Sequence, residues 1–419
     1  MEVVVEKSEI NGEVSAPPSK SYTHRAFIAA SLSRNCKVIS PLISQDTLAT
    51  LKNCNKLGAT YVRKGDSIHF RGIDEIRAGD YFYFGNSGTT LRFFISLLSL
   101  SNSPKLSVLD GDNSLRNRPN RELLLSIKKL GARIATRNFK APLKVGGLMK
   151  GGEKVIIKPI SSQFVSSLLF SLPLANFDTE IEVLKLPSRP YVEITLEVLR
   201  ESGIEIVRDK NNFYIPSGQA FNLKKFKVPA DFTSLSYLIC AALIAGKIKV
   251  KGVYDSLQGD RRIIEVCKRM GAEISWDKES GVLKAEKSDL EGIEVDAKDI
   301  PDLVPTISVL AAIAKGRTII KNVENLMFKE INRIEGIVSN LRNLGVESSY
   351  SDGKIVIKGG SERFIGEINS FGDHRMALAF SLLGLSGRVL CRDASVVSIS
   401  FPEFFDLLSE LGARIKKST

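Results

Sequence analysis

Apolar residues follow two alternating helical patterns along this chain. In the first pattern a short polar start precedes a run that is apolar nearly all round, as in SKSYTHRAFIAASL and DFTSLSYLICAALIAG. In the second pattern the apolar residues form one stripe and the run ends in glycine, as in RELLLSIKKLG. All-round apolar helices are typical of buried positions, and one-sided stripes are typical of helices that cover a core. The chain therefore predicts buried and half-exposed helices in alternation, with short strands between them.

The one-sided pattern occurs six times, at intervals of about 70 residues, and each copy leads through a glycine into a strand-like segment. Glycine is the usual residue after the last helical turn, because it adopts a positive φ without strain. The six glycines are Gly58, Gly131, Gly203, Gly271, Gly345 and Gly412. Each repeat needs neighbours to cover its apolar face. Six repeats therefore predict an α/β protein of two domains, with three repeats in each.

The predicted break between the domains lies between the third and fourth repeats, in KKFKVPAD. The opening segment MEVVVE reads as a strand without a partner in the first repeat, so we expect it to complete the second domain. We therefore predict an N-terminal domain of residues 14–226 and a C-terminal domain of residues 1–13 plus 227–419. The two connections, near residues 11–14 and 225–230, would form a hinge.

Composition and charge narrow the function classes. The chain has 419 residues, of which 43% are hydrophobic, and a net charge of +12, so it can bury two cores and favours an anionic partner. The basic residues are dispersed, without an arginine-rich tail, which counts against nonspecific nucleic-acid binding. The most apolar helix candidate, Leu235 to Ala245, is too short to span a bilayer, and the N-terminus lacks the pattern of a signal peptide.

Cysteine and histidine usage adds two expectations. The five cysteines are scattered without a C-x-x-C pair, which is typical of a reduced cytoplasmic protein. The three histidines have no metal-binding spacing, so we expect no metal site.

The stretch SAPPSKSYTHRA is the first candidate for chemistry. Pro17 and Pro18 mark a helix start near Ser19. The first turns then carry two cations and a hydroxyl, namely Lys20, Ser21 and Arg25. Free N–H groups and the helix dipole favour an anion at such a site. Taken alone, the pattern fits a solvated N-terminal turn better than an anion site.

Unusual polar residues gather at the starts of all six predicted buried helices. They are Lys20, Ser21 and Arg25; Asn86, Gly88 and Arg92; Ser161, Ser162 and Gln163; Asp231; Asp302; and Asp373, His374 and Arg375. Two interpretations are open: a ring of helix N-termini that holds an anion, or ordinary helix caps. Capping is favoured for Asp231, and the two interpretations are balanced for Asp302. Function is favoured for His374 and Arg375, because an arginine in a first helical turn opposes the dipole.

Three weaker signals complete the candidates. GNSGTT is glycine-rich but is neither a Walker A loop nor a G-x-G-x-x-G motif, so a turn is as good an interpretation as a phosphate loop. Arg118 stands in SLRNRP, where a surface turn is the plain alternative. In FKEINR, Lys329 and Arg333 are four residues apart, which predicts one helical face with Glu330 beside Lys329.

Nine motifs in order now resemble one family. They are SAPPSKSYTHRA, GNSGTTLR, SLRNRP, SSQF, SRPY, IPDLVPT, NVENLMFKEINR, FGDHRMA and SFPEFF. Together they resemble the EPSP synthase (3-phosphoshikimate 1-carboxyvinyltransferase) family of enolpyruvyl transferases, from Lys20 to about Phe405. Each motif is weak alone, and their order together with the sixfold repeat is specific. The resemblance implies a two-domain inside-out α/β barrel of six βαβαββ repeats, three per domain, with the active site in the interdomain cleft.

The resemblance also implies the reaction and its participants. The enolpyruvyl group of phosphoenolpyruvate would pass to the 5-hydroxyl of shikimate 3-phosphate, with release of phosphate, in aromatic amino acid biosynthesis. No metal or organic cofactor is implied. We expect a cytoplasmic monomer whose partners are these two small anionic substrates, without nucleic acid or membrane.

Residue roles follow from the matching motifs. Asp302 resembles the general base, Glu330 together with Lys20 resembles the proton donor, and His374 joins the catalytic group. The residues that resemble shikimate 3-phosphate contacts are Lys20, Ser21, Arg25, Ser161, Ser162, Gln163, Ser188, Tyr191, Asp302, Asn325 and Lys329. The residues that resemble phosphoenolpyruvate contacts are Lys20, Asn86, Gly88, Arg118, Gln163, Arg333 and Arg375.

One position departs from the family pattern. Many bacterial members have a lysine two residues before the Phe-Pro of the last motif, and Ile399 occupies that position here. Either another cation such as Arg392 replaces the lysine, or the contact is absent.

Two rival functions remain open at this point. A UDP-N-acetylglucosamine enolpyruvyl transferase would share the fold, but it would need a loop cysteine that the region after GNSGTT lacks. An RNA-binding or RNA 3′-end-processing repeat protein would fit the basic charge, but it would need an aromatic platform or a long basic groove.

Overall fold

The structure is a computed structural model that describes residues 1–418 and divides into two compact units. The N-terminal unit is Pro18–Val228, and the C-terminal unit combines Met1–Pro17 with the chain from residue 229 onward. The predicted boundary at residue 14 would cut through β2 (Ile10–Ser15). That strand pairs along its whole length with β15 (Gly246–Lys251), so it belongs to the C-terminal unit.

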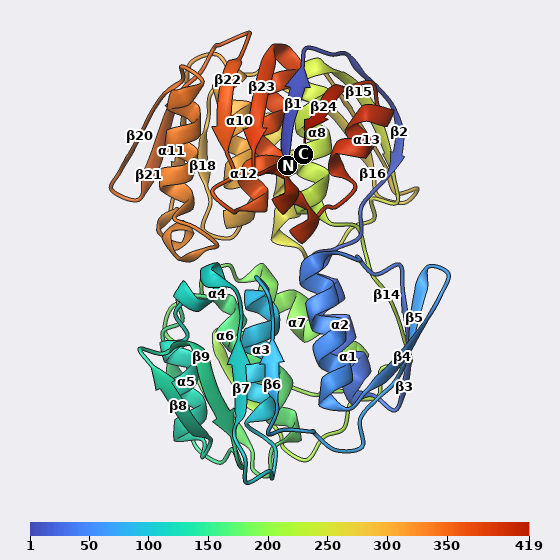
Figure 1. Ribbon diagram of the computed structural model, residues 1–419, viewed down its shortest axis with the longest axis vertical. Coiled ribbons are helices and arrows are strands. Elements are labelled where there is room, and N and C mark those ends of the chain that lie inside the picture. Colours follow the sequence, from blue (N-terminus) through green and yellow to red (C-terminus); the bar gives the residue numbers. More distant parts are fainter. Residues whose placement is uncertain (419) are drawn as a thin grey trace. The chain divides into compact units, whose positions relative to one another are not determined.

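Each unit contains three four-stranded sheets built on one plan, in which a parallel pair is extended by two antiparallel strands (Figure 1). In strand order, the sheets of the N-terminal unit are β14 (Lys225–Lys227), β3 (Asn35–Ile39), β5 (Ser67–Arg71), β4 (Thr60–Lys64); β6 (Tyr81–Tyr83), β7 (Ser107–Asp110), β9 (Lys140–Gly146), β8 (Arg133–Arg137); and β10 (Val155–Ile157), β11 (Thr179–Val183), β13 (Asn212–Ile215), β12 (Val207–Asp209).

The C-terminal unit repeats this plan. Its sheets are β2, β15, β17 (Val282–Glu286), β16 (Glu273–Asp277); β18 (Glu294–Asp296), β19 (Arg317–Lys321), β21 (Lys354–Lys358), β20 (Glu347–Ser351); and β22 (Ile365–Asn369), β23 (Arg388–Arg392), β1 (Glu2–Glu6), β24 (Arg414–Ser418). The N-terminal strand β1 lies between β23 and β24, with Val4 opposite Leu390 and Lys416. Residues 1–418 thus form six separate sheets and no closed barrel.

The two predicted helix types alternate as expected. The buried helices are α1 (Lys20–Leu32), α3 (Gly88–Leu98), α6 (Ser162–Ser171), α8 (Phe232–Ala245), α10 (Val304–Ile313) and α12 (His374–Phe380). The amphipathic helices are α2 (Gln45–Leu57), α5 (Arg121–Lys129), α7 (Pro190–Glu201), α9 (Ile263–Arg269), α11 (Arg333–Asn343) and α13 (Phe404–Glu410). The six predicted cap glycines all have positive φ, between 76° and 123°. This left-handed backbone ends each amphipathic helix before the next strand.

Short helical segments connect these elements. They are α4 (Asn113–Asn117) and the 3₁₀ turns η1 (Leu172–Leu174), η2 (Gly259–Arg262), η3 (Pro301–Leu303), η4 (Glu324–Phe328), η5 (Ser381–Ser386) and η6 (Ala394–Ile399). Several of the site residues lie on these turns or directly beside them.

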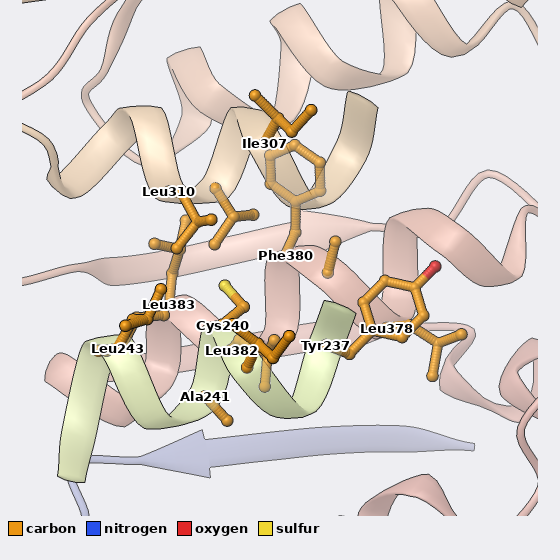
Figure 2. Packing of buried hydrophobic residues seen from close by; sticks show 14 of the residues in the cluster. Tyr237, Cys240, Ala241, Leu243, Ile307, Leu310, Leu378, Phe380, Leu382 and Leu383 are labelled. Atoms are coloured by element: carbon orange, nitrogen blue, oxygen red, sulfur yellow. The ribbon is translucent and has the colours of Figure 1, made fainter. Parts of the chain in front are cut away.

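Each unit has one hydrophobic core, formed where its buried helices pack together. Figure 2 shows this packing in the C-terminal unit, where Cys240 of α8, Leu310 of α10 and Phe380 of α12 approach one another. Burying the helices on all sides leaves mainly their N-terminal turns for charged side chains. None of the helices within residues 1–418 combines the length and apolar character needed to cross a membrane.

Candidate active site

The C-terminal unit gathers charged side chains around Asp302. This residue lies in η3, just before α10, and its side chain is buried. Arg333 Nη1 donates to Asp302 Oδ1 at 2.8 Å, and Lys329 Nζ donates to the same oxygen at 3.2 Å. Arg375 Nη2 donates to Asp302 Oδ2 at 2.9 Å. Three cations bonded to one carboxylate stabilise its ionised form.

Arg333, the first residue of α11, is the most fully compensated cation of this set. Its guanidinium also donates to Asp373 Oδ2 at 2.7 Å and to Glu330 Oε2, and its side chain is 1% exposed. Burial by itself would lower the pKa of Arg333. The negative charges of Asp373, Glu330 and Asp302 outweigh burial and raise this pKa above its ordinary value. The guanidinium is therefore permanently charged and fixes three carboxylates.

The first turn of α12 supplies His374 and Arg375. Asp373 caps this helix by accepting a hydrogen bond from the Arg375 backbone N–H at 2.8 Å. The Arg375 guanidinium also donates to the Tyr237 hydroxyl of α8 at 3.3 Å, and burial raises the pKa of Tyr237 to about 12. The His374 side chain is fully buried, with Nδ1 4.0 Å from Asp373 Oδ1. The predicted helix start is confirmed, and Arg375 links it to Asp302.

The segment FKEINR differs from its prediction. Lys329 and Arg333 do not share a helical face, because η4 ends at Phe328, Lys329 is extended and α11 begins only at Arg333. On one helix the two cations would repel each other, whereas the turn between them lets both bond to one oxygen of Asp302. Asn325 lies in η4, and its buried Oδ1 has no hydrogen-bond partner within residues 1–418.

The N-terminal unit presents its cations differently, as Arg25 of α1 shows. Arg25 Nε donates to Thr195 Oγ1 at 2.8 Å, Nη1 to the Ser21 carbonyl at 2.8 Å and Nη2 to the Tyr191 carbonyl at 3.0 Å. No carboxylate of residues 1–418 lies within 4 Å of this guanidinium. Burial lowers the pKa of Arg25 to about 10. Arg25 is therefore a buried cation held only by neutral groups.

Lys20 opens α1, which Ser19 caps by accepting from the Tyr22 backbone N–H at 3.4 Å. Lys20 Nζ donates to Asp46 Oδ2 of α2 at 2.9 Å, and both side chains are mostly buried. Asp46 was not predicted as a site residue. Its carboxylate holds the lysine in one position at the helix start.

The GNSGTT segment brings a third group together at the start of α3. Arg118 Nη2 donates to Asn86 Oδ1 at 2.6 Å, and Arg92 Nη1 donates to Gln163 Oε1 of α6. A Cβ added to Gly88 would lie 2.9 Å from Arg118 Nη1 and 3.4 Å from Arg92 Nη1. Glycine at position 88 thus leaves room for two guanidinium groups beside a helix N-terminus. This is the arrangement expected of an anion site.

The remaining predicted residues lie at the starts of α6 and α7, two helices that pack against each other. Ser161 caps α6 by accepting from the Gln163 backbone N–H at 3.3 Å, and Ser162 is the first residue of that helix. Ser188 is buried, with a positive φ of 50°, just before α7. Tyr191 is the second residue of α7, and its carbonyl is the one that accepts from Arg25.

Two positions in the site correct or extend the predictions. Arg392 does not replace the missing lysine at Ile399, because it forms ion pairs with Glu2 and Glu367 on an exposed sheet face. Ile399 itself is buried in η6. Sequence reasoning missed Asp46 and Thr195, which lie outside the recognised motifs, as positioning groups. It placed Asp373 at a helix start but did not predict its bond to Arg333.

Similar solved structures identify the class of fold. An EPSP synthase of Acinetobacter baumannii is similar with a TM-score of 0.84 and 25% identity, covering 99% of this chain and 100% of that chain. The enolpyruvyl transferase NikO from Streptomyces tendae, at 16% identity and a TM-score of 0.80, shares the fold and is covered over 99% of its length. The six repeated units are therefore the fold of the enolpyruvyl transferases.

Sequence relatives identify the family. The family model of EPSP synthase (3-phosphoshikimate 1-carboxyvinyltransferase) matches residues 4–408. The chain is 56% identical over 416 residues to the 3-phosphoshikimate 1-carboxyvinyltransferase of Archaeoglobus fulgidus, covering 99% of both chains. It is 41% identical over 425 aligned positions to the protein of that name from Methanothrix thermoacetophila, covering 100% of both. The chain belongs to the EPSP synthase family and is an enzyme of the transferase class, as its motifs predicted.

Proposed function

We propose that this chain transfers the enolpyruvyl group of phosphoenolpyruvate to the 5-hydroxyl of shikimate 3-phosphate and releases phosphate, as a step of aromatic amino acid biosynthesis. The curated relatives carry the name of this activity. The observation that carries the proposal is the cluster around Asp302, where one carboxylate is bonded to Lys329, Arg333 and Arg375. Such a cluster combines a fixed base with cations that can bind anionic substrates. The names of these relatives do not favour either rival function.

Asp302 is the proposed general base. The attacking 5-hydroxyl must lose its proton as its oxygen bonds to C2 of phosphoenolpyruvate, and an ionised carboxylate can accept that proton. The cations around Asp302 hold its side chain in one orientation, which favours reaction with a correctly placed hydroxyl.

Glu330 and Lys20 are the proposed proton donors to the methylene carbon, C3, of phosphoenolpyruvate. Addition of the alcohol at C2 and a proton at C3 gives a tetrahedral intermediate. Loss of the C3 proton and of phosphate then regenerates the double bond. The bond to Arg333 fixes the orientation of the Glu330 carboxyl group, which must take up a proton before it can donate one. His374 is the remaining proposed catalytic residue, at the same helix start as Arg375.

The proposed anion contacts are the residues that the matching motifs indicate. The proposed shikimate 3-phosphate contacts are Lys20, Ser21, Arg25, Ser161, Ser162, Gln163, Ser188, Tyr191, Asp302, Asn325 and Lys329. The proposed phosphoenolpyruvate contacts are Lys20, Asn86, Gly88, Arg118, Gln163, Arg333 and Arg375. The carboxylate-free surroundings of Arg25 support this division, because a buried cation without a counter-charge is stabilised by a bound anion. Arginine forks also suit phosphate and carboxylate geometry.

The finer points of fold and setting are part of the same proposal. Fully buried helices and sheets with one exposed face support an inside-out arrangement within each unit. The five cysteines are free and buried, which fits a cytoplasmic setting. We further propose a monomer that binds two small anions, without nucleic acid, membrane or organic cofactor. Lysine and arginine side chains supply the charge neutralisation in this scheme.

The direct test is phosphate release by purified protein with both substrates, repeated with each substrate omitted. Release that requires both supports the transfer, and the carboxyvinyl product should form in equal amount. Release with UDP-N-acetylglucosamine in place of the shikimate compound would keep the fold and overturn the acceptor. No release with either acceptor would overturn the enzymatic proposal itself.

A further inference from the structure

Asp260 is a buried carboxyl group that the proposed chemistry does not use. It lies in η2 of the C-terminal unit and is 3% exposed. Thr233 Oγ1 is hydrogen-bonded to Asp260 Oδ2, whereas Oδ1 is buried without a hydrogen-bond partner in the described part of the chain. Within residues 1–418, no lysine or arginine nitrogen lies within 4 Å of this carboxyl. A buried carboxyl in such surroundings favours its neutral form, because ionisation would leave an uncompensated charge.

Asp302 has the opposite surroundings, with three cations bonded to its carboxylate. One helix connects the two acids. Thr233, in the first turn of α8, bonds to Asp260. One turn later, Tyr237 accepts from Arg375, which in turn bonds to Asp302 (Tyr237 is labelled in Figure 2). Both η2 and η3 pack against α8, so the same helix surface positions both carboxyl groups.

The carboxylates that face Asp260 raise its pKa in the same sense as burial does. Burial is the largest cause that raises its pKa, and the negative charge of Asp302 is the next. Asp231, the cap of α8, adds a smaller rise, while the Thr233 bond and the positive charge of Arg375 lower the pKa. The result is a pKa of about 7, far above the ordinary value of 3.8. Because the two carboxyl groups interact, the protonation of each one changes the pKa of the other.

We propose that Asp260 and Asp302 form a carboxyl pair that holds one proton below neutral pH, with the proton on Asp260 and the charge on Asp302. Two carboxyl groups whose environments differ in this way divide the acid and base forms between them. Asp260 is then a positioning residue that does not touch substrate. Its proton keeps a second negative charge away from a site that must bind two anions. The pair holds two protons only after Asp302 has accepted the hydroxyl proton.

This inference rests on the proposed role of Asp302 as base, but its test needs no substrate. Difference infrared spectroscopy of the full chain, with carbon-13 aspartate, reports the carbonyl stretch of a protonated carboxyl group. We expect a band at pH 6 that titrates away with a midpoint near the pKa of Asp260, about 7. Asp260→Asn should abolish this band. Asp302→Asn should keep the band and move its midpoint to lower pH by on the order of one unit, because the neighbouring charge is gone.

Asp255→Asn is the matched control, since Asp255 is exposed and paired with Arg261 and Lys278. It should leave both band and midpoint unchanged. Persistence of the band in Asp260→Asn would show that another acid holds the proton and would overturn the proposal. An unchanged midpoint in Asp302→Asn would show that the two acids are not a pair. Both infrared outcomes are measured without substrate and do not depend on whether the wild-type protein releases phosphate. Failure of the pair and failure of the proposed function can therefore be told apart.

Discussion

Arg25 and Arg333 are both buried guanidinium groups, yet their surroundings differ. Arg333 in the C-terminal unit bonds to Asp302, Asp373 and Glu330, and its pKa is raised above the ordinary value. Arg25 in the N-terminal unit bonds to a hydroxyl and two carbonyl groups, and burial lowers its pKa to about 10. Carboxylates of the protein neutralise the charge of Arg333, whereas the charge of Arg25 can be neutralised by a bound anion.

The contrast extends to Arg92 and Arg118, whereas Lys20 of the N-terminal unit does bond to a carboxylate, that of Asp46. Arg92 and Arg118 of the N-terminal unit bond to the side-chain amides of Gln163 and Asn86. In the C-terminal unit the cations are bonded to carboxylates that can take up or release protons. We infer a division of labour, in which the N-terminal unit mainly binds anions and the C-terminal unit mainly moves protons. The following predictions test that division, from the largest expected effect to the smallest.

Removing the charge of Asp302 should have the largest effect on turnover. We expect Asp302→Asn to lower kcat by about 10²–10⁴-fold, the usual contribution of a general base. Binding of shikimate 3-phosphate, followed by calorimetric titration, should change far less because most of its proposed contacts remain. Turnover close to that of the wild type would remove Asp302 as the base. Asp255→Asn serves as a control for the substitution itself.

The two arginines should differ in their effect on stability. Arg333→Met leaves two buried carboxylates, Asp302 and Asp373, and the partly buried Glu330 without their shared cation. We therefore expect a loss on the order of 3–5 kcal/mol in the free energy of unfolding. Arg25→Met removes hydrogen bonds to neutral groups, which destabilises the fold, but it also removes a buried charge, which offsets part of that loss. The free energy of unfolding should therefore fall by only about 1–2 kcal/mol. Urea unfolding of both variants measures this difference. Equal losses would contradict the contrast between compensated and uncompensated cations.

The pH dependence of stability should reveal Asp260. Its pKa is about 7 in the native state against 3.8 as the ordinary value, so the folded chain binds this proton more tightly than the unfolded chain does. Stability from this group is therefore present below pH 4, falls as pH rises towards 7 and stays low above it. As the pH rises from 4 to 8, the free energy of unfolding of Asp260→Asn should increase relative to that of the wild type by on the order of 1–4 kcal/mol.

Asp255→Asn gives the control of opposite sign for that measurement. Hydrogen bonds from Lys278 and Arg261 outweigh the effect of partial burial and lower the pKa of Asp255. Its contribution is therefore present above its unfolded pKa and is lost as pH falls. Relative to wild type, Asp255→Asn should thus lose stability on going to higher pH. A pH-independent difference for Asp260→Asn would show that its native pKa is not raised.

Gly88→Ala should have the smallest effect, confined to one substrate. The added Cβ would meet Arg118 Nη1 at 2.9 Å, a distance that requires this flexible side chain to shift. We expect the KM for phosphoenolpyruvate to rise about threefold to tenfold, equivalent to roughly 1 kcal/mol of binding. Steady-state kinetics measures this change. Gly65→Ala, in an open turn with a φ of 60°, should reduce stability and leave that KM unchanged.

Local signals in the sequence predicted local structure well. The N-cap of α8 is Asp231, which accepts from the Ser234 backbone N–H at 2.8 Å as the capping interpretation required. Ser19 likewise caps α1, after the two prolines that marked its start. Such bonds join residues two or three positions apart, so their partners are visible in a short stretch of sequence.

Predictions that needed a partner from elsewhere succeeded less well. The spacing of Lys329 and Arg333 suggested one helical face. In the structure the chain turns between them, and both cations bond to Asp302. Asp260 carried no signal, because its burial and its missing counter-charge exist only in the folded unit. The boundary at residue 14 was misplaced because β2 is held by β15, a strand more than two hundred residues later.

By itself, the sequence determined the six repeats, the two helix types, the caps and the family, since hydrophobic period, capping and motif order are read along the chain. The tertiary structure alone decided which charges meet. The hydrogen bonds of the site join residues far apart in the sequence: Lys20 and Asp46 are separated by 26 positions, Arg375 and Asp302 by 73, and Arg25 and Thr195 by 170. The charge of each site residue depends on these partners and on burial, and both arise only when distant segments pack together.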